Sequence, residues 1–145
     1  MLDVACHCIN LRRAARSLTE VYDRALAPAG LRVTQYSLLR AIRRLGRPTI
    51  TELARATGLD RSTLGRNLRV LAREGLVAVG AGADERTRVV GLTPRAGAAL
   101  GLALPHWQAA QRAVDAVLGA EGEAALVEVA SRLGQLGDLA DGDAR

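Results

Sequence analysis

Residues 49–93 read TITELARATGLDRSTLGRNLRVLAREGLVAVGAGADERTRVVGLT, and this stretch decides the fold. Thr49 and Glu52 have the spacing of a capping box, in which each side chain accepts a bond from the other residue's backbone amide, so a helix is expected to begin there. Gly58 is suited to end that helix with a left-handed backbone, and Asp60 to cap the next helix. Two helices joined by so short a turn predict a helix-turn-helix.

The second helix of this stretch, expected over residues 61–74, has two opposed faces. At about 100° per residue, its apolar residues fall on one side, namely Leu64, Leu68, Leu71 and Ala72. The opposite side carries arginine and serine without any acidic residue, and such side chains reach base edges and phosphates. Charge alone would fit any solvated helix face, but the preceding glycine turn and the following basic hairpin favour a DNA-recognition helix. The residues expected to contact DNA are Arg61, Ser62, Thr63, Arg66, Asn67, Arg69 and Arg73.

A β-hairpin is expected after this helix. The runs 76–80 and 88–92 are rich in valine and leucine, and the loop between them contains glycine, acidic residues and arginine. Arg86 and Arg88 lie near the expected tip, and an arginine on a narrow hairpin can enter a minor groove, where the potential is negative. A helix-turn-helix followed by such a hairpin is a winged helix, and a short third strand near Thr49 is compatible with it.

Two blocks of residues narrow this interpretation. The first reads LAxxxGLDRSTLxRNLxxLxxxGLV from Leu53 to Val77, a pattern that many helix-turn-helix families share in part. The second block is much narrower and consists of Asp84, Arg86, Val90, Leu92, Thr93, Pro94 and Gly97. Together they resemble the MarR family of bacterial transcriptional regulators, and the match extends over nearly the whole chain because the flanking helices also fit.

The resemblance implies a mainly α-helical fold with a small β-hairpin wing. It implies a homodimer with intertwined terminal regions, bound to a pseudo-palindromic operator in double-stranded DNA. It also implies repression that a small aromatic or phenolic ligand relieves. We therefore expect dimerisation helices in residues 1–30 and 96–145 and the DNA-binding region in residues 31–95, within one intertwined structural domain.

The charge of the chain is concentrated on the expected winged helix. All 20 basic residues are arginine, and the formal net charge is +5. Residues 32–95 hold 13 arginines and 5 acidic residues, a net charge of +8, whereas the remainder holds 7 arginines and 10 acidic residues, a net charge of −3. GC-rich codon usage explains arginine in place of lysine, but the placement of the charge is that of a phosphate-binding surface.

Length and composition predict one helical domain. A chain of 145 residues is long enough for a single core. With only Tyr22, Tyr36 and Trp107 as aromatic residues, that core must consist of leucine, valine and alanine. The sequence has no apolar run of membrane-spanning length and no basic and apolar leader at its N-terminus, which predicts a cytoplasmic protein.

The expected first helix carries an apolar seam. Its apolar residues repeat in alternating steps of four and three, which is typical of a helix that packs along another helix. The seam consists of Val4, Cys8, Leu11, Ala15, Leu18, Tyr22 and Ala25. A second helix is expected over residues 31–45.

Two further helices are expected after the hairpin. Thr93 is suited to cap the first of them and Pro94 to occupy its first turn, and it runs towards Gly119 with Pro105 inside it. The last helix begins near Glu121 and has one apolar face. Because these seams lie outside the winged helix, the terminal helices can pack against each other within one chain or against a second copy. The resemblance to the MarR family implies the second copy.

The N-terminal cysteines suggest two kinds of chemistry. Cys6, His7 and Cys8 resemble metal ligands in type, but on a helix the two cysteines point about 200° apart. The only other histidine is His106, so we expect no metal site and no cofactor. A mutual disulfide is also not expected in a cytoplasmic protein.

Cys8 alone is a redox candidate. It is expected near the start of the first helix, one turn before Arg12, where the helix dipole and the guanidinium both favour a thiolate. In the organic-hydroperoxide-sensing branch of the resembling family, a reactive cysteine precedes a helix arginine by eight residues, with a tyrosine further along; Cys8, Arg16 and Tyr22 match that pattern. The sequence departs from that branch at Arg12 and Val33, where further tyrosines stand. The alternative is a small buried cysteine in a helix seam.

A small-molecule pocket is a further hypothesis. Many regulators of the resembling family bind aromatic acids between the dimer helices and the winged helix. Arginine and an aromatic ring would hold a carboxylate and a ring, which makes Arg12, Arg16, Tyr36 and Trp107 candidates for the wall. The alternative is that the two aromatic residues belong to the core and that Arg16 forms a structural salt bridge.

Three functions remain at this point, and none is enzymatic, because the sequence contains no phosphate-binding loop and no recognisable catalytic set. The first is a ligand-released DNA-binding repressor. The second is a repressor that senses oxidation through Cys8. The third is a winged helix that binds protein instead of DNA, against which the outward arginines count.

Overall fold

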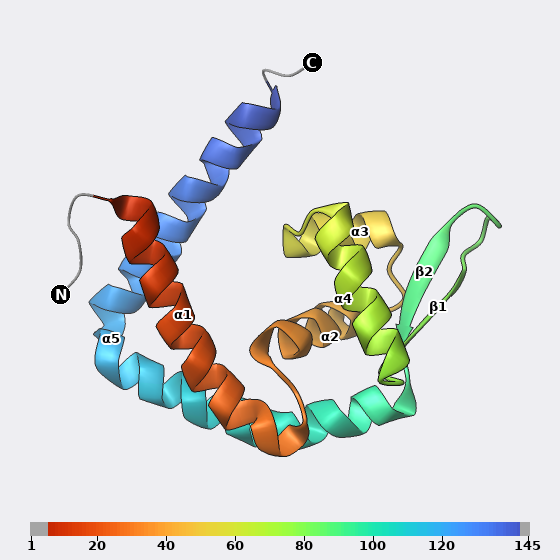
Figure 1. Ribbon diagram of the computed structural model, residues 1–145, viewed down its shortest axis with the longest axis horizontal. Helices are drawn as coiled ribbons and strands as arrows, with labels where there is room; N and C mark the ends of the chain where they lie inside the picture. Colours follow the sequence, from red (N-terminus) through yellow and green to blue (C-terminus); the bar gives the residue numbers. More distant parts are fainter. Residues whose placement is uncertain (1–5, 143–145) are drawn as a thin grey trace. The chain divides into compact units, whose positions relative to one another are not determined.

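The computed structural model describes residues 6–142 of the chain (Figure 1). The elements are α1 (His7–Leu26), the short 3-10 helix η1 (Ala27–Ala29), α2 (Val33–Leu45), α3 (Ile50–Thr57), α4 (Arg61–Arg73), β1 (Val77–Ala81), β2 (Arg88–Leu92) and α5 (Pro94–Gly142). They form two compact units, one ending at Gln108 and the other beginning at Ala109. The expected fold class, mainly helical with a small hairpin, is confirmed.

The first two helices begin later than expected. Position 4, part of the expected seam, lies outside the described residues. Cys6 has an extended backbone (φ −128°, ψ 105°) and caps α1, because its carbonyl accepts the first helical bond, from the Asn10 amide at 3.1 Å. The start of α2 moves to Val33 because the Arg32 amide donates to Gln35 Oε1 at 3.0 Å, and the Val33 amide donates to the Asp23 carboxylate at 2.7 Å. These side chains satisfy amides that have no partner inside the helix.

The helix-turn-helix forms as its caps predict. Thr49 Oγ1 accepts from the Glu52 amide at 3.1 Å, and Glu52 Oε2 accepts from the Thr49 amide at 2.8 Å, which completes the capping box. Gly58 ends α3 with φ 68°, a left-handed value. Asp60 then caps α4, because its Oδ1 accepts from the Thr63 amide at 2.8 Å.

The hairpin lies against the start of α3. β1 and β2 are antiparallel, with Val79 opposite Val90. The expected third strand is reduced to one bridge, between Thr49 and Val89, extended by a bond from the Val90 amide to the Pro48 carbonyl at 2.9 Å. No longer strand can form there, because Pro48 has no amide hydrogen and α3 begins at Ile50.

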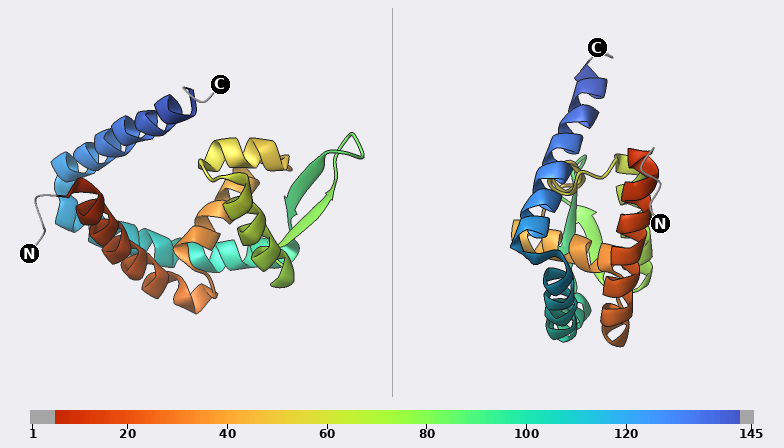
Figure 2. Two further views of the ribbon diagram at one scale, coloured as in Figure 1. Left: turned by 45° about the horizontal axis from the view of Figure 1, so that its top comes forward. Right: turned by 90° about the vertical axis from the view of Figure 1, so that its left-hand side faces the viewer.

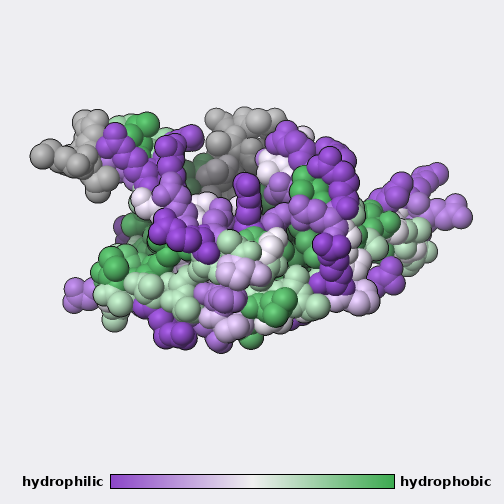
Figure 3. All heavy atoms as spheres, turned by 60° about the horizontal axis from the view of Figure 1, so that its bottom comes forward, coloured by the Kyte–Doolittle hydropathy of each residue, from purple (hydrophilic) through white to green (hydrophobic). Residues whose placement is uncertain are grey.

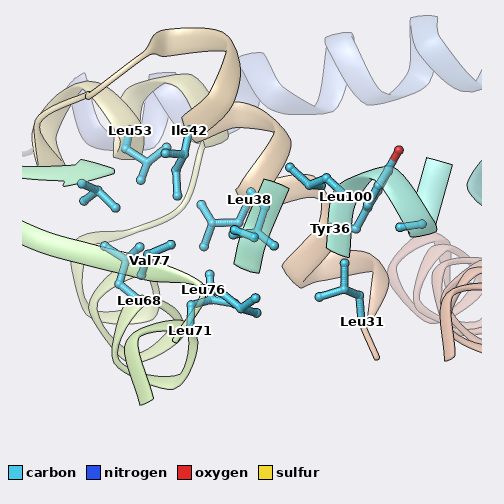
Figure 4. Close-up of a cluster of buried hydrophobic side chains, with 14 of the residues drawn as sticks. Leu31, Tyr36, Leu38, Ile42, Leu53, Leu68, Leu71, Leu76, Val77 and Leu100 are labelled. Atoms are coloured by element: carbon cyan, nitrogen blue, oxygen red, sulfur yellow. The ribbon is translucent and has the colours of Figure 1, made fainter. Parts of the chain in front are cut away.

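An aliphatic core joins these elements. Figure 4 shows Leu38 and Ile42 of α2 near Leu53 of α3, with Leu68 of α4 in the same cluster. All four side chains are at most 3% exposed. The first part of α5 contributes a further buried leucine and two alanines, namely Ala96, Leu100 and Ala103. Helix packing therefore fixes the position of α4 by its leucines, as the sequence indicates.

The long helix α5 begins and breaks at the expected residues. Thr93 Oγ1 accepts from the Ala96 amide at 3.2 Å and caps it, while Pro105 lies inside a continuous helical span. Gly119 has non-helical angles (φ 65°, ψ 173°), so the helical segment that follows is separate, as expected. None of the described helices is both long enough and apolar enough to cross a membrane.

Each unit exposes aliphatic side chains along its helices. In the apolar seam of α1, the N-terminal residues Cys8, Leu11 and Ala15 are exposed. The later residues Leu18 and Tyr22 are half-buried. In the segment after Gly119 the exposed aliphatic residues include Leu126, Val127, Val129, Leu133 and Leu136. Such continuous apolar helix faces indicate association with another surface.

We predict opposite effects of alanine at two glycines with open surroundings. Gly58→Ala should lower the free energy of unfolding by about 1–2 kcal/mol, since a Cβ disfavours the left-handed backbone. Gly97→Ala, inside α5 and also without neighbours near its Cβ position, should raise it by roughly 1 kcal/mol. Urea denaturation at equal protein concentrations measures both. Equal effects of the two substitutions would contradict the turn geometry.

Candidate nucleic-acid interface

The helix α4 lies at the surface between α3 and the hairpin (Figures 1 and 2). Leu64, Leu68 and Leu71 are at most 3% exposed and fix its inner face. The expected outward residues Ser62, Arg66, Arg69 and Arg73 are all exposed. Apolar burial on one side therefore holds a row of cationic and hydroxyl groups in solvent on the other, as a helix that enters a DNA groove requires.

A hydrogen-bonded network organises the first turn of α4. Both carboxylate oxygens of Asp60 bind Thr63: one accepts from its amide at 2.8 Å and the other from its hydroxyl at 2.7 Å. An Arg66 Nη atom donates to Thr63 Oγ1 at 3.4 Å. The hydrogen bond from the Thr63 side chain is the main reason why the pKa of Asp60 lies below its ordinary value of 3.8. Asp60 is therefore ionised at neutral pH.

Arg61 is held by a residue that the sequence did not single out. Its Nη donates to the hydroxyl of Thr51 on α3 at 2.5 Å, which ties the start of α4 to α3. Thr51 is separated from Arg61 by ten residues across a turn, so no local spacing could have identified it. The bond orients an exposed guanidinium at the start of α4.

Asn67 occupies a different environment from its neighbours on α4. It is half-buried and lines a cavity of about 310 Å³ together with Thr34, Gln35 and Leu38 of α2. Asn67 also lines a smaller cavity together with Val33 of α2. Among the seven α4 residues expected at DNA, Asn67 is thus the one that faces α2.

The hairpin presents arginines at an ordered tip. The Arg86 amide donates to Asp84 Oδ1 at 3.1 Å, and the Thr87 amide donates to the Asp84 carbonyl at 2.9 Å. Arg86 and Arg88 are both exposed, and Figure 3 shows hydrophilic side chains covering the tip at the right of the view. Asp84 thus shapes the turn from which the Arg86 side chain extends.

The four candidate pocket residues separate into two groups. Tyr36 and Trp107 come together, with ring centroids 5.9 Å apart. The arginine beside them is Arg40, whose guanidinium carbon lies 4.9 Å from the Trp107 centroid and 5.7 Å from that of Tyr36. Arg12 and Arg16 are exposed on α1. Arg40 follows Tyr36 by four residues on α2, a spacing that places both on one helix face and could have revealed it.

The N-terminal thiols are accessible. Cys8 is exposed in the first turn of α1, Cys6 is half-buried, and both are free. The expected separation of about 200° does not describe this pair, because Cys6 is extended and outside the helix. Tyr22, also assigned to the redox set, is half-buried. Within residues 6–142, no three His, Cys, Asp or Glu side chains gather closely enough to hold a metal ion.

Comparison with solved structures gives the same fold over nearly the whole chain. The transcriptional regulator MosR of M. tuberculosis, solved in complex with DNA, is 43% identical, with a TM-score of 0.84 over 93% of this chain and 98% of MosR. B. bronchiseptica BpsR, whose DNA binding is regulated by 6-hydroxynicotinic acid, is 22% identical, with a TM-score of 0.79 over 92% of this chain and 96% of BpsR.

A third similar structure is a cysteine-to-serine variant of E. coli MarR complexed with operator DNA. It is 22% identical, with a TM-score of 0.75 over 91% of this chain and 99% of that one. The model of the MarR family matches residues 29–87. Among proteins of curated function, none matches the chain.

The fold and the exposed arginines of α4 and the hairpin define a winged helix-turn-helix DNA-binding protein. The family follows from two findings: 43% sequence identity to MosR over almost the full length of both chains, and the match to the model of the MarR family. The chain belongs to the MarR family of DNA-binding transcriptional regulators.

We predict that Arg66→Ala weakens binding to an operator selected from a random duplex library by about 1–3 kcal/mol and relaxes its sequence preference. The reason is the loss of an outward guanidinium from a helix that remains packed through its leucines. Fluorescence anisotropy at fixed salt measures the affinity. Arg112→Ala, which removes an equal charge outside residues 31–95, is the matched control. Equal affinities of the two variants would show that α4 does not read the groove.

Proposed function

We propose that the chain is a homodimeric repressor that reads a pseudo-palindromic operator through α4 and the hairpin and leaves it when a small effector binds. The observation that carries this proposal is the exposed, acid-free row of Ser62, Arg66, Arg69 and Arg73 on a helix anchored by buried leucines. Its partners are double-stranded DNA and a second copy of the chain, as for the family. Such a regulator acts in the cytoplasm, where bacterial DNA lies.

Within this proposal the regions of the chain divide the work. Residues 31–95 supply the DNA contacts, namely Arg61, Ser62, Thr63, Arg66, Asn67, Arg69 and Arg73 from α4 and Arg86 and Arg88 from the hairpin. Residues 1–30 and 96–145 supply the dimer contacts, which the exposed aliphatic faces of α1 and of the segment after Gly119 support. Half-sites then lie about one helical turn apart, roughly 34 Å.

The effector site proposed for a small aromatic acid centres on Tyr36 and Trp107. Their rings pack with Arg40, so one guanidinium and two aromatic rings lie within one cluster. Arg12 and Arg16 of α1 join this site only if the second copy of the chain or the ligand draws them in. BpsR, whose DNA binding responds to a hydroxylated aromatic acid, shares the fold and supports this class of effector.

A second candidate input is oxidation of Cys8. The observation in its favour is that Cys8 is an exposed free thiol in the first turn of α1, and exposure makes a thiol accessible to oxidants. A hydroperoxide would transfer one oxygen atom to the Cys8 thiol, giving a sulfenic acid and releasing an alcohol or water. This would place a polar group at an apolar seam. Tyr22 lies on the same seam, further along α1.

We predict that the seam residues hold the dimer together. Leu133→Asp and Leu11→Asp each place a charge on an exposed aliphatic face and should dissociate or unfold the dimer, since an unpaired charge cannot be buried cheaply. Light scattering gives the mass and circular dichroism the helix content. Glu123→Asp, a charge-conserving change on the same segment, is the control. A stable dimer from both aspartate variants would disprove this assignment of the interface.

The effector proposal is tested on the preformed operator complex. Under reducing conditions, simple aromatic acids such as salicylate should release DNA from the wild type but not from Arg40→Ala, while Arg24→Ala, another exposed arginine, should respond normally. Coupling of this kind is worth about 1–3 kcal/mol. Release that requires peroxide and disappears in Cys8→Ser would instead establish the thiol as the input.

A further inference from the structure

In the protein without DNA, the hydroxyl of Thr63 already donates its hydrogen to Asp60. Asp60 accepts two bonds from Thr63 and is ionised, so its carboxylate can only accept. The hydrogen in the 2.7 Å contact between the two side chains must therefore belong to Thr63. Arg66, on the other side, is a donor without acceptor capacity, so Thr63 Oγ1 accepts from it at 3.4 Å. The direction of both bonds follows from the charge states of the partners.

Only acceptor capacity remains on Thr63 for a DNA base. A hydroxyl has one hydrogen to donate and two lone pairs, and the hydrogen is used by Asp60. One lone pair faces Arg66 over a long contact, and no donor within residues 6–142 is recorded for the other. Thr63 is partly exposed and lies in the first turn of α4, from which recognition helices contact base edges.

We propose that Thr63 is a specificity-determining residue that selects a base presenting an exocyclic amine in the major groove, namely the N4 of cytosine or the N6 of adenine. In that groove guanine offers only acceptors and thymine an acceptor and a methyl group, so the lone pair of Thr63 would meet another lone pair there. Turning the hydroxyl towards such an acceptor would break its bond with Asp60 and leave a charged cap partly unpaired. This inference rests on the proposed groove contact of α4 and names which base it reads.

Asp60 is thus a positioning residue in addition to a helix cap. It does not itself face a base in this proposal, but it fixes which way the Thr63 hydroxyl points. Arg66 remains free to leave Thr63 and bind DNA, because its contact is the longest of the three and uses one Nη atom.

The first experiment compares sequence preferences. Wild type, Thr63→Val and Thr63→Ser are each used to select operators from the same random duplex library. Valine keeps the shape of threonine without the hydroxyl, and serine keeps the hydroxyl. We expect Thr63→Val to lose the preference at one position in each half-site, with other positions unchanged, and Thr63→Ser to retain it.

The second experiment identifies the atom that is read. At the Thr63-dependent position, cytosine or adenine is replaced by an analogue without the exocyclic amine. Wild-type affinity should fall about fivefold, the equivalent of one neutral hydrogen bond, and Thr63→Val should be unaffected. A 7-deazapurine, which lacks only an acceptor, should leave the difference between wild type and Thr63→Val unchanged.

The third experiment tests the part played by Asp60. Asparagine caps a helix about as well as aspartate, but its amide can donate, so the hydroxyl of Thr63 becomes free to turn. Asp60→Asn should accept guanine or thymine at the same position while its helix content and thermal midpoint remain those of wild type.

Several outcomes would overturn the proposal. These are a Thr63→Val profile identical to that of wild type, a dependence on an acceptor instead of the amine, and an unrelaxed preference in Asp60→Asn. A failure of the proposed DNA-binding function would give a different result. Neither the wild type nor any variant would then show salt-dependent duplex binding, and Arg66→Ala would match the wild type.

Discussion

One short segment, Pro48 with Thr49, connects the helix-turn-helix to the hairpin of the winged helix. Thr49 caps α3 through its hydroxyl and its amide, and in the same place it bridges to Val89 of the hairpin. The carbonyl of Pro48 accepts from the amide of Val90, a fully buried residue of β2. The start of the helix-turn-helix and the base of the wing are therefore joined by backbone bonds, and neither can shift without breaking them. The relative position of α4 and the hairpin arginines depends on this joint.

The local signals in the sequence predicted local structure well. The capping box at Thr49, the left-handed Gly58, the cap at Asp60 and the break at Gly119 all rest on interactions among residues close in the chain. The starts of α1 and α2 were wrong for a related reason. Periodicity continues past a helix end, whereas the end itself is set by the backbone. Cys6 is extended before α1, and Gln35 and Asp23 bind the amides at the start of α2.

Contacts between elements were beyond the reach of the sequence. The bond from Arg61 to Thr51 depends on how α3 and α4 cross, and the position of Asn67 beside α2 depends on the tilt of α4. The pairing of Tyr36 with Trp107 joins residues 71 positions apart, although the role of Arg40 was readable from its spacing on α2. The acidic Asp60 illustrates the same limit: its cap is a local prediction, but its hold on the Thr63 hydroxyl is visible only in three dimensions.

The small number of aromatic residues in the chain has a consequence for spectroscopy. Trp107 is the single tryptophan, and its indole lies against Arg40 and close to Tyr36, where α5 passes α2. Fluorescence at wavelengths longer than the tyrosine emission band therefore originates from Trp107 alone. Because the indole contacts Arg40 and lies close to Tyr36, the chain carries an intrinsic fluorophore at the α2–α5 junction without any label.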